Sequence, residues 1–202
     1  GIRLKRSLYF PSRIKITQSV GHYSIADTML LLEAWINQVN VETFAVRPCF
    51  NGVPCILYYT NGYLTLAVAS YDGIKGREVT EHIKRVRGVP FIIPNKVTCE
   101  IAGTVIMRNS RFAAFAPGQF ASAYHAVTGS LLLRDYALVE ERGLDFCVHD
   151  IVIDEQPFAL SEHEKKTLWE HWGFQDNGIA FVHTLEEIRN LYIKFNTAKH
   201  GA

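Results

Sequence analysis

Residues 47–80 read RPCFNGVPCILYYTNGYLTLAVASYDGIKGREVT and contain the clearest structural signal of the chain. Two apolar runs, residues 55–59 and 63–70, lie on either side of the dipeptide Asn61-Gly62. Asn-Gly between such runs is the strongest local signal of a β-hairpin, because both turn positions need a positive φ. The stretch therefore predicts two antiparallel strands joined by a tight turn.

The segments around this hairpin alternate between helical and strand patterns. Asp27 is a suitable N-cap for a helix, and Ser161 with Glu164 forms a capping-box sequence. No repeat or low-complexity linker divides the chain, so we expect an extended basic lead-in at residues 1–22 and a single α+β domain at residues 23–202. We expect helices at residues 28–39, 77–84, 110–115, 161–172 and 185–195, and further strands at residues 43–46, 97–107 and 146–153.

Composition predicts an intracellular globular protein. The chain has 202 residues, 48% of them hydrophobic, and its formal net charge is only +1. It contains no apolar run long enough to span a membrane and no apolar signal-peptide core, so we expect a cytoplasmic protein, with nucleoid association left open. Zinc-like spacing is absent from the four cysteines, which we expect to be reduced, buried thiols: Cys49, Cys55, Cys99 and Cys147.

The order of motifs resembles the adenylation domain of NAD-dependent DNA ligases. The resemblance begins in residues 47–80 and continues through residues 99–107, 120–131 and 172–174. It implies an α+β nucleotidyltransferase (ATP-grasp-like) ligase adenylation fold, with antiparallel sheets and flanking helices. The family's Asp-Gly-Val-Val-Ile-Lys strand has no counterpart, so we expect a fold truncated at its C-terminal end.

The resemblance also implies where the chemistry of the family would lie. In the family, a lysine attacks the α-phosphorus of NAD, and that position is Cys49 here, whose thiol cannot form the same phosphoramidate. Asn51 stands at the position of the motif aspartate, and Thr104 at that of a strand glutamate. The former nucleotide cleft would then be formed by Arg47, Cys49, Asn51, Ser70, Ala102, Thr104 and Tyr124.

All seven of these positions differ in type from the family's residues, which predicts a pseudoenzyme without cofactor or metal. On this interpretation the domain is an interaction or accessory module that binds another protein, in a DNA replication, DNA repair or virus-encoded complex. Tyr124 is a candidate contact for such a partner, because tyrosine is enriched at protein interfaces. Two alternatives stay open: a non-catalytic NAD or adenine-nucleotide module, and one subunit of a split NAD-dependent DNA ligase.

Three further functional interpretations, which concern a cysteine, a pair of histidines and two basic clusters, each have a simpler structural alternative. Cys49 could be a nucleophile activated by Arg47, but a buried thiol is the favoured interpretation. His163 and His171 lie eight positions apart on one predicted helix, which favours a solvated face over a metal site. DNA binding is the third interpretation, and its weak candidates are two basic clusters, Arg3, Lys5 and Arg6 near the start and Lys84, Arg85 and Arg87 further along.

Overall fold

The computed structural model describes most of the chain and divides it into two compact units. Unit 1 consists of Gly1–Tyr9 and Phe50–Asn177, and unit 2 of Phe10–Cys49 and Gly178–Ala202. The expectation of a single domain stays a prediction. The described residues are 2–3, 25–38, 41–70, 75–115, 117–154, 160–175 and 178–200. Most of the expected basic lead-in therefore lies outside them.

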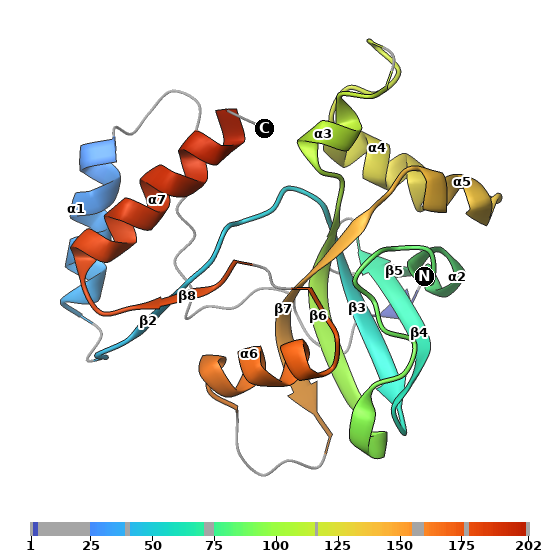
Figure 1. Cartoon of the computed structure of the whole chain (residues 1–202), viewed down its shortest axis with the longest axis horizontal. Helices are drawn as coiled ribbons and strands as arrows, with labels where there is room; N and C mark the ends of the chain where they lie inside the picture. Colours follow the sequence, from blue (N-terminus) through green and yellow to red (C-terminus); the bar gives the residue numbers. More distant parts are fainter. Residues whose placement is uncertain are drawn as a thin grey trace. The chain divides into compact units, whose positions relative to one another are not determined.

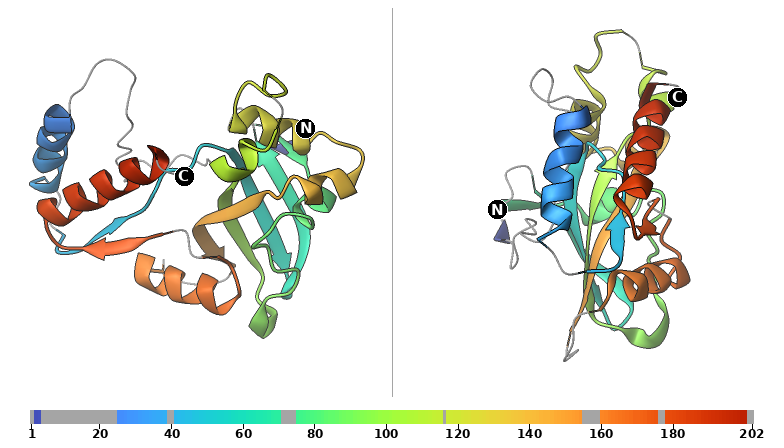
Figure 2. Two further views of the ribbon diagram at one scale, coloured as in Figure 1. Left: turned by 45° about the horizontal axis from the view of Figure 1, so that its top comes forward. Right: turned by 90° about the vertical axis from the view of Figure 1, so that its left-hand side faces the viewer.

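Unit 1 is built on a six-stranded antiparallel sheet, which can be followed in Figures 1 and 2. The strand order is β1-β5-β4-β3-β6-β7, so that β3 and β6 lie inside the sheet. This confirms the expected α+β architecture with antiparallel sheets and flanking helices. The bounds are β1 Ile2–Arg3, β3 Val53–Thr60, β4 Tyr63–Ser70, β5 Lys75–Glu78, β6 Cys99–Ile106 and β7 Asp145–Ile153.

The β3–β4 hairpin forms as the sequence predicts. Asn61 and Gly62 both adopt positive φ, at 54° and 83°. The Gly62 N–H donates to the Val97 carbonyl at 2.8 Å, and the Gly62 carbonyl accepts from the Ile93 N–H at 2.8 Å. The turn is therefore held both by its own conformational preference and by the segment that precedes β6.

Helices flank this sheet. In Figure 1, α3, α4 and α5 lie together where β6 ends and β7 begins, and α6 lies beside β7 further along. Ser161 caps α6 and exchanges hydrogen bonds with Glu164, which confirms the predicted capping box. The bounds are α2 Thr80–Ile83, η1 Pro94–Lys96, α3 Asn109–Phe112, α4 Ala123–Ser130, α5 Tyr136–Glu141 and α6 Glu162–His171.

The core of unit 1 lies mainly on one face of the central strands. Cys55, Leu57 and Tyr59 of β3 alternate with less buried residues, and each is almost fully inaccessible to solvent. Tyr59 also donates its hydroxyl hydrogen to the Pro90 carbonyl at 2.6 Å, which satisfies its polar end inside the core. The opposite face carries the polar side chains described below, together with the buried Ile56 and Val68.

Unit 2 is a two-stranded ribbon with two helices. Strand β2 (Phe44–Val46) pairs antiparallel with β8 (Ala180–Val182), and helices α1 (Ile25–Ile36) and α7 (Leu185–His200) pack on them. A small apolar cluster joins all four elements: Leu32, Phe44, Val182 and Ile188. Unit 2 is thus made from two segments that are far apart in the sequence.

Several expected boundaries are wrong. Arg77 and Glu78 belong to strand β5, not to a helix, because β5 pairs with the edge of β4 in the register Val68↔Glu78 and Ala69↔Arg77. Asp27 lies inside α1 rather than capping it. Helices α4 and α5 and strand β8 were not expected, and among the described residues no helix is long and apolar enough to cross a membrane.

Candidate functional site

Three of the seven predicted cleft residues lie on one face of the sheet in unit 1. Ala102 and Thr104 of β6 are paired with Ile56 and Pro54 of β3. Ser70 follows Val68 of β4 by two residues, and Val68 is paired with Ile56. Residues two apart on a strand and residues paired across strands share a face, so Ser70, Ala102 and Thr104 lie together opposite the apolar core.

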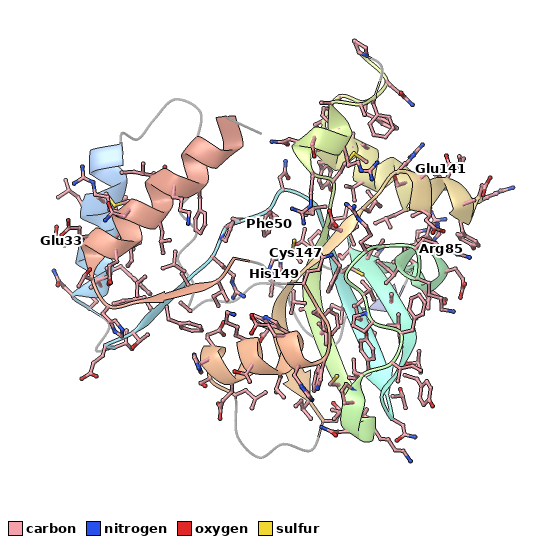
Figure 3. All side chains as sticks on the ribbon, in the orientation of Figure 1. Glu33, Phe50, Arg85, Glu141, Cys147 and His149 are labelled. Carbon is pink, nitrogen blue, oxygen red and sulfur yellow. The ribbon has the colours of Figure 1, made fainter. Side chains whose placement is uncertain are left out.

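A histidine that sequence reasoning missed reaches this face through a β-bulge. The pairing of β6 with β7 shifts between Ala102 and Gly103, so that His149 is an extra residue on β7. Its Nε2 lies 2.6 Å from Thr104 Oγ1, within hydrogen-bond distance. Figure 3 labels His149 on β7 together with Cys147, which is paired with Thr104. The bulge thus re-aims a titratable ring toward a predicted cleft position.

An ion pair also lies at this part of the sheet. Asp150 is paired with Ala102 across the two strands, and the Lys165 amine from α6 lies 2.6 Å from its carboxylate. Lys165 also lies 3.1 Å from Glu162, one turn earlier on the helix. Both members of the Lys165–Asp150 pair are largely buried. A cation and a carboxylate therefore accompany the Thr104–His149 pair.

Ser70 has a hydrogen bond of its own on this face, and Asn51 and Tyr124 occupy different surroundings. The Ser70 hydroxyl donates to the Lys75 carbonyl at 2.9 Å, so it ties β4 to the start of β5. Asn51 is exposed, and Tyr124 is half-buried on α4 with its ring edge-on to His125. Of these side chains, Asn51 is the most accessible to a ligand.

The other two predicted residues, Arg47 and Cys49, belong to unit 2. The expectation of a buried Cys49 is wrong, because this thiol is exposed while the other three are buried. Burial raises the pKa of Cys99 and of Cys147 to about 12, and it raises the pKa of Cys55 further still. Cys49 is thus the accessible thiol of the described residues, and the gathering of all seven positions in one cleft stays a prediction.

The basic residues predicted as candidates for DNA binding differ in their acidic partners. Lys84 pairs with Glu81 at 2.6 Å, and Arg85 lies 3.4 Å from Glu140. Arg87 instead binds the buried carboxylate of Asp145 at 2.9 Å. Lys5, Arg6 and the side chain of Arg3 lie outside the described part of the chain.

The histidines His163 and His171 are both exposed on α6, as a solvated helix face requires. Within the described ranges, no group of three or more histidine, cysteine, aspartate or glutamate side chains could hold a metal ion.

Comparison with known proteins agrees with this architecture, which is that of a nucleotidyltransferase adenylation domain. Residues 24–201 match the family described as the NAD-dependent DNA ligase adenylation domain, and the chain belongs to that family.

The chain is also similar to curated proteins named DNA ligase. The relative from Campylobacter lari is 30% identical over 88% of this chain and 29% of its own length. The relative from Endomicrobium trichonymphae is 31% identical over 78% of this chain and 25% of its own length. The chain therefore spans roughly a quarter to less than a third of these relatives.

The expectation that the chain is not an enzyme is wrong. The matched family is an adenylation-domain family and the relatives are named DNA ligase, which points to an enzyme. The expectation rested on residue types at seven aligned positions and ignored every other polar group. His149 and Asp150 of β7 and Lys165 of α6 add polar groups at this face, so the seven positions alone do not define its chemistry.

A sequence signal for these missed residues does exist. His149 and Asp150 are two polar residues inside the otherwise apolar run of residues 146–153, which forms most of β7. Charged or polar residues in a buried strand are rarely placed there without a partner. The signal marks the pair as noteworthy, but it does not identify Thr104 or Lys165 as the partners.

Proposed function

We propose that this chain is the adenylation domain of a DNA ligase-type enzyme and that it accepts AMP from NAD. The observation that carries the proposal is the family match over residues 24–201, which takes in most of each unit. The relatives named DNA ligase support it across most of this chain. NAD enters the reaction as a substrate, because the nicotinamide mononucleotide half leaves when AMP is transferred.

We assign the role of AMP acceptor to Cys49. The proposal is supported by the sequence resemblance, from which Cys49 is expected at the position of the family's nucleophile, and by the exposure of its thiol. The buried thiols of Cys99 and Cys147 have a pKa of about 12 and are poor nucleophiles near neutral pH. In the step, the Cys49 sulfur attacks the α-phosphorus, an S–P bond forms, the P–O bond to nicotinamide mononucleotide breaks, and the thiol proton passes to solvent.

The sheet face of unit 1 can contribute polar groups but not the family's arginines. Ala102 has no polar side-chain atom, Ser70 donates to a backbone carbonyl, and Thr104 is paired with His149. Lys165 and His149 are the cationic and titratable groups that accompany them. We therefore propose that the residues that bind the nucleotide differ from those that the resemblance implies.

We also propose that sealing of DNA requires further protein. The relatives from Campylobacter lari and Endomicrobium trichonymphae are more than three times as long as the segment that this chain matches. A second protein or further segments would supply the remaining steps, in DNA replication or repair. This retains the split-ligase alternative, with the acceptor on the present chain.

The test is incubation with NAD labelled in its AMP half, followed by mass spectrometry of the intact chain and of its peptides. We expect one AMP adduct on the peptide that contains Cys49. The Cys49→Ser variant should lose the adduct. Cys49→Lys should carry an adduct with the acid lability of a P–N bond rather than a P–S bond.

Two results would overturn the proposal. An adduct that persists in Cys49→Ser would move the acceptor role to another residue. Absence of an adduct on the unmodified chain, together with no rise in melting temperature when NAD or AMP is added, would remove the adenylation function itself. Cys99→Ser serves as the control, since Cys99 is buried and its replacement should leave adduct formation unchanged.

A further inference from the structure

Helix α1 of unit 2 is apolar almost all the way round. Its 12 residues include only two charged ones, Asp27 and Glu33. A helix on the surface of a protein normally has one apolar side and one polar side. The inner side of α1 packs in the apolar cluster of unit 2 through four residues: Met29, Leu32, Trp35 and Ile36. The outer side should therefore be polar, but its residues are mostly apolar as well.

The outer side of α1 exposes two adjacent leucines. Leu30 is 64% exposed and Leu31 is 60% exposed. Ala34 lies four and three positions after them, and Asn37 and Gln38 lie three and four positions after Ala34, so these five exposed side chains share one side of the helix. We name them the outer stripe. Single exposed apolar residues are common, but a contiguous apolar patch is typical of an interaction site.

The segment that contains the outer stripe is negatively charged. Residues 25–46 include no lysine or arginine, whereas Glu33, labelled on α1 in Figure 3, and Glu42 are both exposed. The last turn of α1 has no basic residue, so the partial negative charge of the helix C-terminus adds to that of the carboxylates. The neighbouring helix α7 exposes two acids and two bases between residues 186 and 194, which balance: Glu186, Glu187, Arg189 and Lys194.

Shape and charge together define what can cover the outer stripe. Apolar side chains must cover the leucines, and cations must lie near Glu33 and the C-terminal end of α1. A second copy of α1 would place like charges against one another, and anionic lipid headgroups would be repelled in the same way. An amphipathic helix with basic residues beside its apolar side meets both requirements, and the small Ala34 allows it to approach closely.

We propose that the outer stripe of α1 binds an amphipathic, basic helix of another protein. Leu30, Leu31 and Ala34 form the apolar centre of the contact, and the amides of Asn37 and Gln38 belong to its polar rim. The charge of α1 selects a basic partner over an acidic one. The proposal goes beyond the adenylation function and does not depend on it, because it uses neither a nucleotide nor the sheet face of unit 1.

The test is fluorescence anisotropy of two labelled synthetic peptides, each titrated with the full chain in the absence of NAD. Both peptides are about 18 residues long, or about five helical turns, and carry the same stripe of leucines. One has lysine on its polar side and the other has glutamate. We expect the lysine peptide to bind about tenfold more tightly or better, and high salt should reduce this preference. Binding of neither peptide, or equal binding of both, would overturn the proposal.

Variants of the chain show where the lysine peptide binds. Leu30→Gln with Leu31→Gln should weaken its binding about tenfold or more, because two leucines leave the contact. Glu33→Lys should weaken the lysine peptide and strengthen the glutamate peptide. The matched control, Leu132→Gln with Leu138→Gln, changes two exposed leucines of unit 1 and should keep the original affinity. Equal losses in the two double variants, with melting curves that show both to be folded, would contradict binding at α1.

Two further measurements distinguish the other possible occupants of the outer stripe. Size-exclusion chromatography with light scattering should show a monomer, and the chain should not float with phosphatidylcholine vesicles. A dimer that dissociates in the Leu30→Gln, Leu31→Gln variant would assign the outer stripe to a second copy of the chain. Flotation that is lost in the same variant would assign it to a lipid surface. Either result would overturn the proposal of a basic helix as the partner.

Discussion

Thr104 of β6 and His149 of β7 are joined by a hydrogen bond of 2.6 Å that exists only because β7 carries an extra residue at its bulge. Thr104 is buried and His149 is half-buried. A buried polar atom whose partner is removed costs more than the bond contributed. The pair should therefore be energetically coupled.

A double-mutant cycle measures this coupling. Thr104→Val and His149→Phe should each destabilise unit 1, and their combined effect should be smaller than the sum by about 1 kcal/mol, since either change already breaks the bond. The measurement is urea unfolding of the four proteins. Thr104→Val combined with His82→Phe is the control, because His82 bonds the Leu133 carbonyl instead, and these effects should add. Additivity in the Thr104–His149 cycle would contradict the coupling.

Two glycines should respond to alanine with opposite signs. A Cβ on Gly103 would overlap Phe146 Cζ and lie 2.5 Å from the Cys147 carbonyl oxygen, so Gly103→Ala should destabilise by about 1–3 kcal/mol. A Cβ on Gly129 would meet Phe120 at an ordinary 3.5 Å inside helix α4. Gly129→Ala should therefore stabilise by about 1 kcal/mol. Denaturant midpoints of the two variants test the pair, and a shared sign would refute the packing described here.

Thiol labelling should single out Cys49 in the folded protein. Cys49 is exposed, and burial raises the pKa of Cys99 and Cys147 to about 12, so these thiols hold their protons at pH 8. Ellman's reagent should therefore react with one thiol per native chain, with none in Cys49→Ser, and with all four in denaturant. Rapid labelling of a second native thiol would show that the core of unit 1 opens more readily than its packing implies.

Helix caps should make stability fall in acid. The Ser161 hydroxyl and N–H lower the pKa of Glu164, and the N–H groups of His183 and Thr184 with the Thr184 hydroxyl lower that of Glu187. A folded pKa below the unfolded value of about 4.3 gives stability that is full above this pH and is lost as the pH falls through the folded pKa. The melting temperature should therefore drop as the pH falls below about 5.

Ser161→Ala should flatten part of this acid dependence. Ser122→Ala is the matched control, because Ser122 caps α4 without a carboxylate and its replacement should cost about 1 kcal/mol equally across pH 3–5. Melting curves over that range make the comparison. Equal acid slopes in the unmodified chain and in Ser161→Ala would assign the dependence to other carboxylates.

Local signals predicted the parts of the fold that local interactions determine. Asn61-Gly62 encodes its turn by backbone preference alone, and Ser161 with Glu164 satisfies the first turn of α6 within four residues. Arg77 and Glu78 were expected in a helix, because their strand exists only through pairing with β4. β8 likewise depends on β2, far away in the sequence.

The candidate site also has some features with a local sequence signal and others that depend on long-range contacts. The resemblance gave positions such as Thr104, and the sheet register places Ser70, Ala102 and Thr104 on one face. His149 reaches Thr104 through a bulge, and Lys165 reaches Asp150 from a separate helix, so neither contact has a local signal. The exposure of Cys49 also depends on the folded environment rather than on neighbouring residues.

Unit 2 is built from two segments that are far apart in the sequence, and this affects its folding during synthesis on the ribosome. Phe44 of β2 pairs with Val182 of β8, so β2 stays unpaired for on the order of ten seconds, until β8 has been translated. During that interval Leu32 and Phe44 lack the cluster that buries them, while residues 50–177 already hold most of unit 1. The nascent chain therefore exposes the apolar residues of α1, and a chaperone can bind them until α7 has been synthesised. A premature stop before residue 180 would leave these residues permanently exposed.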